Sequence, residues 1–271
     1  MISRYYRIAD IAVKMEMDAA YGFPSFREFE TESVEAPEIV VEMYQGNRLF
    51  QQWYGIEYYP PEEKENLFIS KWYPGVRLTA GRDWKRMVIE GCACGEDGVM
   101  EVFLAGFYSY FSGRGGILCH ASAIEWKGEA VIFTAASGTG KTTQAELWER
   151  YRGAKILNGD KMLLETGGAC CRAWGSPWRG SSPYARNESA PLRAVIVLEQ
   201  AEENFIRKLA GAEILAAFSP HLFYPMWNRA CVKTVMEALD WLLERTPVYL
   251  LACRPDQEAV ELVHRTIWGE G

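Results

Sequence analysis

The chain has 271 residues, of which 49% are hydrophobic and 10 are Trp, so it can bury the core of one large domain or of a domain with a smaller partner. Its formal net charge of −7 argues against binding to nucleic acid or to an anionic membrane surface, because either partner would require concentrated Lys and Arg. Any phosphate binding must therefore be local.

The cysteines and the N-terminal segment indicate a reducing, cytoplasmic environment. The seven cysteines are odd in number, and no apolar run follows a basic start at the N-terminus. The longest apolar candidate, residues 102–111, is far shorter than the roughly 20 residues that cross a bilayer. Neither Cys92–Cys94 nor Cys170–Cys171 has zinc-ligand spacing, so these thiols are interpreted as buried or idle groups.

The first hundred residues are rich in strand patterns. Apolar residues fall mostly on alternate positions over residues 6–17, which we interpret as one strand with a small slip. Further strands are predicted at 38–44, 49–59, 66–73 and 85–91, with turn residues between them. We therefore expect a β-rich accessory region over residues 1–112 and a second region over 113–271.

The pattern changes toward alternating strands and helices around residue 113. A helix is predicted over 99–111, and two strands joined at 126–129 follow it. Residues 130–134 are wholly apolar, as expected of a central strand covered on both faces. After a glycine loop comes a predicted helix over 141–152 that ends at Gly153. The remaining predicted elements are strands at 155–158, 193–199 and 247–253 and helices at 232–245 and 257–268.

The glycine loop AASGTGKTT, residues 135–143, lies between a predicted strand and a predicted helix, which is the context that a phosphate-binding loop requires. It matches G-x-x-x-x-G-K-[ST] except at the first position, where Ala135 replaces glycine. In such a loop the backbone N–H groups point at the phosphates, Lys141 adds a positive charge, and Thr142 places its hydroxyl on Mg²⁺. The predicted nucleotide-binding residues are Ser137, Gly138, Thr139, Gly140, Lys141, Thr142 and Thr143. A glycine-rich turn with a chance Gly-Lys pair is the alternative.

Asp160 is the predicted catalytic or metal-binding carboxylate. It follows the apolar run of 155–158 and an Asn-Gly turn, and ligands of an open sheet bind at the carboxyl ends of its strands. There it could bind Mg²⁺ or take a proton from an attacking hydroxyl, whereas a solvated turn residue is the alternative. Glu199, at the end of a predicted strand, is a second candidate for the metal. His120 lies upstream of the glycine loop, and a lone His among small apolar residues is more often a satisfied core group than a catalyst.

Three segments together resemble the HPr kinase/phosphorylase family and its relatives with the fold of ATP-dependent phosphoenolpyruvate carboxykinase. They are CHASA at 119–123, SGTGKTT at 137–143 and LNGDKM at 157–162. The likeness covers residues 116–200 well and CRPDQEAV, at 253–260, loosely. It implies an α/β fold, with a P-loop kinase core of this type and a β-rich N-terminal region.

The resemblance also implies site roles, with ATP and Mg²⁺ as ligands. Lys141 and Thr142 would bind phosphate and Mg²⁺. Asp160 would serve as metal ligand or base, and His120 would lie near the γ-phosphate. The chain departs from the family in two places: members usually carry two adjacent acids where this chain has Gly159-Asp160, and the arginine-containing phosphorylase signature is missing. Kinase activity alone is therefore expected.

The loop GSPWRGSSPYARN, residues 175–187, is expected to lie across the mouth of the site, as substrate-gripping segments do in this family. Arg179 and Arg186 could meet a phosphate or an acidic acceptor, and Trp178 could stack on a base or a peptide. The alternative is a surface loop held down by its aromatic residues.

These features predict an ATP- and Mg²⁺-dependent kinase that transfers the γ-phosphoryl group to a Ser or Thr hydroxyl of a peptide or small protein. One alternative is a nucleotide-binding regulatory module without turnover, which Ala135 and the single Asp160 would permit. A kinase of free serine or a similar small molecule is another. Phosphoenolpyruvate carboxykinase itself does not fit so short a chain. The oligomeric state is left open, a homo-oligomer included.

Overall fold

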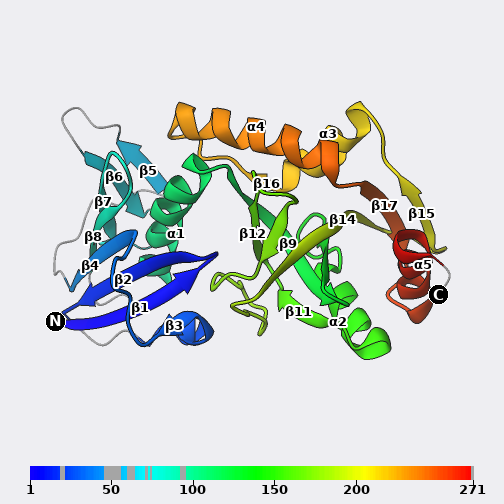
Figure 1. The fold of residues 1–271 in the computed structure, drawn as a ribbon, viewed down its shortest axis with the longest axis horizontal. Coiled ribbons are helices and arrows are strands. Elements are labelled where there is room, and N and C mark those ends of the chain that lie inside the picture. Colours follow the sequence, from blue (N-terminus) through cyan, green and yellow to red (C-terminus); the bar gives the residue numbers. More distant parts are fainter. Residues whose placement is uncertain are drawn as a thin grey trace. The chain divides into compact units, whose positions relative to one another are not determined.

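The computed structural model describes residues 1–18, 22–45, 56–59, 65–70, 73, 75–91 and 96–269. The chain forms two compact units, Met1–Arg114 with Pro225–Val232 and Gly115–Tyr224 with Lys233–Gly271. Each unit has its own sheet, so the protein is of the mixed α/β class (Figure 1). The Cys92–Cys94 pair and residues 49–55 of a predicted strand lie outside the described residues.

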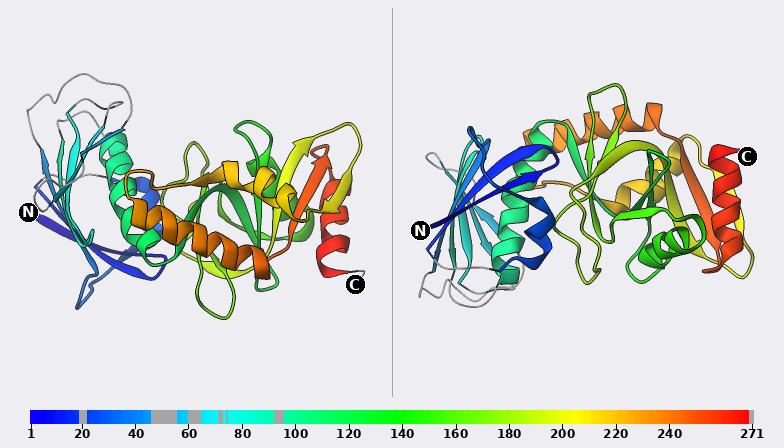
Figure 2. Two further views of the ribbon diagram at one scale, coloured as in Figure 1. Left: turned by 90° about the horizontal axis from the view of Figure 1, so that it is seen from above. Right: turned by 60° about the horizontal axis from the view of Figure 1, so that its bottom comes forward.

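The first unit is built on an eight-stranded sheet with the strand order β3-β1-β2-β4-β8-β7-β6-β5. Its strands are β1 (Ile2–Ile8), β2 (Ile11–Met17), β3 (Glu30–Thr31), β4 (Ile39–Gln45), β5 (Ile56–Tyr59), β6 (Glu65–Ser70), β7 (Arg77–Gly81) and β8 (Arg86–Gly91). A short 3-10 helix, η1 (Pro24–Phe29), precedes β3. Helix α1 (Glu96–Gly113) packs against β6, β7 and β8, which confirms the predicted helix and extends it at both ends (Figure 2).

The predicted single strand over residues 6–17 is wrong, because this segment belongs to a β-hairpin. Strands β1 and β2 pair antiparallel, with Ile8 opposite Ile11. The two turn residues both have positive φ, 48° at Ala9 and 61° at Asp10, as in the two-residue turns that join hairpin strands. The apparent slip in the alternation is this turn, and its Ala-Asp pair lacks the glycine that usually signals one.

The second unit has a nine-stranded sheet. Its strands are β9 (Gly116–Trp126), β10 (Glu129–Thr134), β11 (Lys155–Asn158), β12 (Lys161–Glu165), β13 (Arg172–Trp174), β14 (Ser189–Gln200), β15 (Phe205–Lys208), β16 (Leu222–Phe223) and β17 (Val248–Cys253). The helices of the C-terminal half are α2 (Lys141–Arg152), α3 (Ala212–Phe218), η2 (Ser219–His221), α4 (Arg229–Arg245) and α5 (Gln257–Trp268). Strand β10 pairs with β9 on one side and with β14 on the other, and its residues 130–134 are buried, which confirms the predicted central strand.

Strand β9 pairs with four other strands, and its partners change near its middle. Its C-terminal half pairs with β10 on one edge and β11 on the other, whereas its N-terminal half pairs with β12 and β16. The expected Asn-Gly turn after β11 is a bend at residues 159–160, after which the chain continues along β9 as β12. The register shifts by one residue within β11, so that Leu157 is an extra residue opposite β9.

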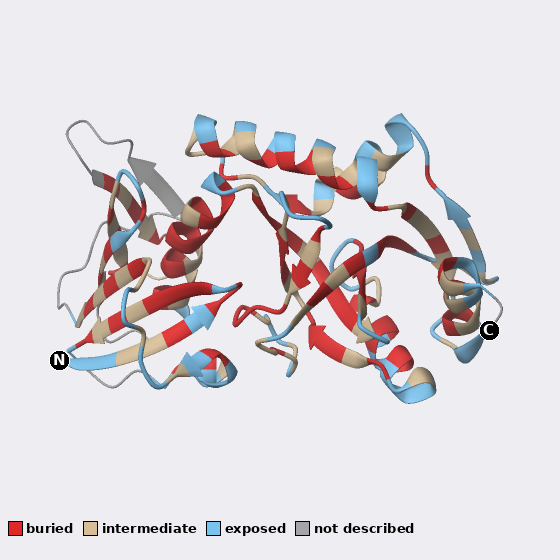
Figure 3. Ribbon diagram, in the orientation of Figure 1, coloured by how far each residue is buried: buried red, intermediate tan, exposed pale blue. Residues whose placement is uncertain are grey.

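The core of the second unit explains why α2 and α5 form where the sequence predicts them. Helix α2 packs against β9, β10 and α5, and Figure 3 shows that it has a buried face. Its Trp148 is fully buried in a cluster with Phe133 of β10 and Val263 of α5. Gly153 ends α2 with a φ of 63°, which confirms the predicted stop. Within the described part of the chain, no helix combines the length and the apolar character that crossing a bilayer requires.

Candidate functional site

The glycine loop leaves the end of β10 and leads directly into α2. Gly138 and Gly140 have φ values of 81° and 113°, the left-handed region that favours glycine. Ala135 is buried and is not among the residues with positive φ, so its methyl group is compatible with the entrance of the loop. Gly140 is also the N-cap of α2 and offers no side chain to the first N–H groups of the helix. These N–H groups and the helix dipole form a site suited to an anion.

Lys141 and Thr142 stand at the start of α2 with their side chains tied to neighbouring carbonyl groups. The Lys141 ammonium donates to the carbonyls of Ala135 at 3.1 Å and Ala136 at 3.3 Å. Burial lowers the pKa of Lys141, and the carboxylate of Asp160 offsets part of this effect. The Thr142 hydroxyl donates to the carbonyl of Gly159 at 3.1 Å. Contacts within the protein therefore already orient both side chains.

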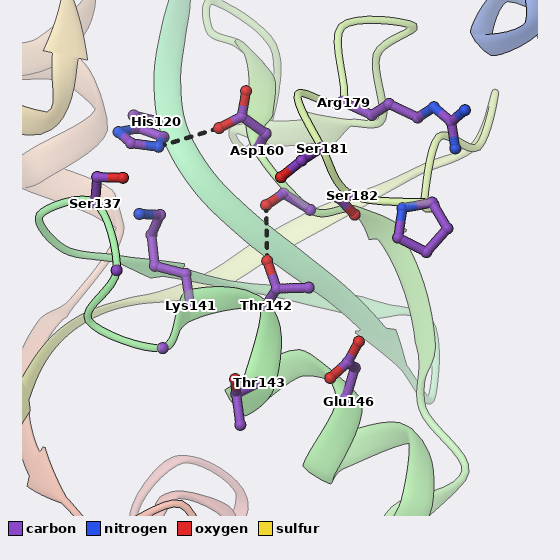
Figure 4. A pocket seen from close by; sticks show the side chains of 14 residues that line it. His120, Ser137, Lys141, Thr142, Thr143, Glu146, Asp160, Arg179, Ser181 and Ser182 are labelled. Atoms are coloured by element: carbon purple, nitrogen blue, oxygen red, sulfur yellow. Dashed lines mark hydrogen bonds and ion pairs between the residues drawn. The ribbon is translucent and has the colours of Figure 1, made fainter.

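A pocket of about 450 Å³ opens beside this loop (Figure 4). Its walls come from the glycine loop, from α2, from the middle of β9, from the bend between β11 and β12, and from the loop of residues 179–183. The lining residues are His120, Ser137, Gly138, Gly140, Lys141, Thr142, Thr143, Glu146, Gly159, Asp160, Arg179, Ser181, Ser182 and Pro183. Six of the seven predicted phosphate-binding residues thus share one cavity with the predicted carboxylate.

His120 and Asp160 form the polar pair of this pocket. His120 Nε2 lies 3.1 Å from Asp160 Oδ1, and Lys161 Nζ contacts the other carboxylate oxygen. Burial by itself would raise the pKa of Asp160, but the hydrogen bond from His120 and the contact with Lys161 outweigh it and lower this pKa to about 2. Asp160 is therefore ionised at neutral pH, and His120 has a polar partner at the pocket rather than an apolar core position.

The bend that carries Asp160 is held by the buried side chain of Asn158. Its Oδ1 accepts hydrogen bonds from the backbone N–H groups of Asp160 at 2.7 Å and Lys161 at 2.9 Å. Its amide donates to the carbonyl of Ser176 at 2.7 Å. A side chain that bonds to the backbone two and three residues ahead stabilises such a bend, so Asn158 fixes the position from which Asp160 faces His120.

The loop of residues 179–183 packs directly against this bend. A Cβ atom at Gly159 would lie 2.0 Å from Ser182 Oγ and 2.5 Å from Ser182 Cβ. A Cβ atom at Gly180 would lie 2.8 Å from Asp160 Oδ2. Position 159, where the resembling family carries a second acid, therefore has no room for a side chain unless this loop moves.

The structure distributes the other predicted residues differently. Thr139 and Glu199 line a second pocket of about 290 Å³ that shares Gly138, Gly140 and Thr143 with the first. Glu199 does not line the pocket of Asp160. Its predicted role as the alternative metal ligand therefore has no support from the geometry.

The three predicted substrate residues fall into two groups. Arg179 lines the first pocket. Trp178, in contrast, is 7% exposed and does not line that pocket, which favours the alternative of a loop anchored by its aromatic residues. Arg186 Nε donates to the carbonyl of Ile156 at 3.1 Å, and its backbone N–H donates to the carbonyl of Leu157 at 2.9 Å. Arg186 thus fastens the loop to β11.

Five lining residues were not singled out by sequence reasoning: Glu146, Gly159, Ser181, Ser182 and Pro183. The serines lie within the loop that the resemblance marked, but nothing in their spacing distinguishes them from ordinary turn residues. Among the described residues, no group of three or more His, Cys, Asp and Glu side chains could hold a metal ion. The Thr142 hydroxyl and the Asp160 carboxylate are among the oxygen ligands that line the pocket, and such hard donors are the ones that Mg²⁺ prefers beside phosphate oxygens.

Comparison with known proteins does not show a family for this chain. No protein-family model and no curated protein matches the sequence. Among solved structures, the chain is similar to the Hpr(Ser) kinase/phosphatase from Coxiella burnetii, at 13% identity and a TM-score of 0.34, over 55% of this chain and 94% of that chain. A TM-score of this size carries neither fold nor function across, so the function must be argued from the pocket itself.

Proposed function

We propose that this protein is an ATP- and Mg²⁺-dependent kinase that transfers the γ-phosphoryl group to a Ser or Thr hydroxyl. The observation that supports this most directly is the meeting of the glycine loop and the His120–Asp160 pair in one pocket. A glycine loop alone would indicate anion binding, whereas an ionised carboxylate beside it adds a group that can hold a metal ion or orient a hydroxyl.

Each group of the pocket has a role in this proposal. The N–H groups at the start of α2 and the Lys141 ammonium bind the phosphates. Thr142 and Asp160 would hold Mg²⁺, which supplies charge neutralisation at the transferring group when it is bound. His120 keeps the Asp160 carboxylate in place. A carboxylate with a pKa of about 2 is a weak proton acceptor, which favours metal binding and hydroxyl orientation over early proton removal.

The second pocket is suited to the nucleoside. It adjoins the glycine loop, shares three of its residues with the first pocket, and has Leu198, Cys253 and Pro255 among its walls. Ligand pockets commonly combine such apolar surface with a few polar groups. The triphosphate would then run from this pocket along the loop toward Asp160.

Calorimetry with Mg²⁺ and ATP tests the first half of the proposal. Loss of a charge-assisted contact worth about 1.5–3 kcal/mol corresponds to about 10- to 100-fold weaker binding for Lys141→Ala. Lys155→Ala is the matched control, because Lys155 pairs with Glu188 at the surface and does not line either pocket. Equal ATP binding by wild type and Lys141→Ala would mean that the loop is a structural turn.

Transfer of labelled γ-phosphate tests the second half, with exposed serine peptides and free serine as acceptors. We propose the peptide as the better acceptor, because Arg179 lines the pocket and can pair with an acidic group on the chain that carries the hydroxyl. Asp160→Asn should keep ATP binding within about tenfold and lower transfer roughly 100-fold or more. ATP binding without transfer to any acceptor would favour a nucleotide-binding regulatory module, a reading supported by the packing of residues 179–183 against Asp160.

A further inference from the structure

The two neighbouring serines of the loop 179–183 are in different situations. Ser182 Oγ accepts a hydrogen bond from the Tyr184 backbone N–H at 3.2 Å and lies over Gly159. Ser181 is exposed and lines the pocket, and its hydroxyl has no hydrogen-bond partner within the part of the chain that the structure describes. One hydroxyl is therefore used in packing and the other is available in the cavity.

The backbone around Ser181 places this residue on the Asp160 side of the pocket, which is the acceptor side, where a hydroxyl that receives the phosphoryl group would bind. Gly180, the preceding residue, is packed so closely on Asp160 that a Cβ atom there would lie 2.8 Å from the carboxylate. The backbone N–H of Ser182 donates to the carbonyl of Arg179 at 3.1 Å, which closes a turn around Ser181. Figure 4 shows the Ser181 side chain among those that line the pocket.

We infer that Ser181 is an intramolecular phosphorylation site, which takes the γ-phosphoryl group of a nucleoside triphosphate bound at the glycine loop of the same chain. This inference rests on the proposed function. The bond from Ser181 Oγ to the γ-phosphorus forms as the bond from that phosphorus to the β,γ-bridging oxygen breaks, and the nucleoside diphosphate leaves with the electron pair. The hydroxyl proton passes to the Asp160 carboxylate late in the step, when bond formation has made it acidic.

The modified loop would regulate the same site. A phosphoserine carries a charge of about −1.5 to −2 at neutral pH. At position 181 it would lie in the pocket, next to Gly180, which packs on the Asp160 carboxylate, and in the same pocket wall as Arg179. Repulsion from Asp160 and occupation of the acceptor side would lower transfer to any external hydroxyl.

Phosphatase-treated protein, incubated with Mg²⁺ and ATP without an acceptor, provides the test. Intact mass should rise by one phosphoryl group, and peptide mapping should place it on Ser181. Ser181→Ala should lose this label, whereas Ser182→Ala, which removes the neighbouring hydroxyl, should still carry it on Ser181. The rate constant should not change when the protein concentration is varied tenfold, because the reaction is intramolecular.

The possible results distinguish a failure of the Ser181 phosphorylation site from a failure of the proposed kinase function. The assignment of the site would be overturned by label on Ser137, Thr143 or Ser182 in place of Ser181. A rate constant that rises with protein concentration would overturn the intramolecular reaction. ATP binding by calorimetry together with transfer to an external peptide, but without label on Ser181, would overturn the inference and leave the kinase intact. Absence of ATP binding would overturn both.

Discussion

Gly159→Ala tests whether the loop 179–183 is closed against the bend that carries Asp160. The added Cβ would lie 2.0 Å from Ser182 Oγ and 2.5 Å from Ser182 Cβ, whereas non-bonded carbon atoms are optimally separated by about 3.5–4.0 Å. The loop must therefore move by more than about 1 Å. Overpacking of this kind costs about 1–3 kcal/mol. At about 2–4 °C per kcal/mol for a unit of this size, Tm should fall by about 2–12 °C.

Thermal unfolding followed by calorimetry measures this change. Gly168→Ala is the matched control in the same unit, because its nearest neighbour would be a carbonyl oxygen at an ordinary 3.8 Å and its φ is not positive. Ser182→Gly removes both clashing atoms, so the double variant Gly159→Ala/Ser182→Gly should lose less stability than the two single changes added together, by about 0.5–3 kcal/mol. Equal Tm values for Gly159→Ala and Gly168→Ala, or strict additivity in the double variant, would refute the reasoning.

Three further outcomes are expected. The folded-state pKa of Asp160 is lowered to about 2 from an ordinary value of about 3.9, so its ionised form contributes on the order of 2 kcal/mol to the free energy of unfolding above pH 4, and this contribution is lost as the pH falls toward 2. Denaturant titrations should show that Asp160→Asn lacks this loss of stability. Equal pH profiles for the wild type and Asp160→Asn would contradict the pairing of Asp160 with His120. Ala135→Gly should leave ATP affinity within about twofold and cost about 0.4–1 kcal/mol in unfolding free energy; a large gain in affinity by calorimetry would show that the methyl group strains the loop. Cys170 is exposed, whereas burial raises the pKa of the Cys171 thiol, so peptide mapping after brief alkylation should find label on Cys170 well before Cys171, and the reverse order would refute this burial.

Much of the second unit follows from local patterns that its tertiary structure reinforces. Helix α5 has an Asp256 N-cap that accepts from the Ala259 N–H, and its apolar residues face the core, so its predicted bounds are correct. The same is true of α2, where two glycines in left-handed conformation bracket the helix. Short strands such as β12 and β13 were missed, because their few apolar residues become strand-like only beside β9 and β14.

The sequence predicts the candidate site only at positions where the residue type itself indicates a chemical role. Lys141 and Asp160 stand out as charged residues after apolar strands, and the structure brings both into one pocket. Gly159 and Ser182 do not stand out, because their role depends on the contact between two backbone segments more than twenty residues apart. Trp178 was open to two interpretations for a related reason: an aromatic residue in a loop can bind a ligand or anchor the loop, and only its burial distinguishes them.

The extra residue in β11 makes the site sensitive to chain length. Leu157 has no opposite residue on β9, and its carbonyl is bonded instead by the backbone N–H of Arg186. A bulge redirects every side chain that follows it, so removal of one residue here would turn Asp160 to the other face of the sheet while leaving the composition of β11 almost unchanged. Among natural variants of this chain, substitutions along β11 should therefore be far commoner than single-residue insertions or deletions.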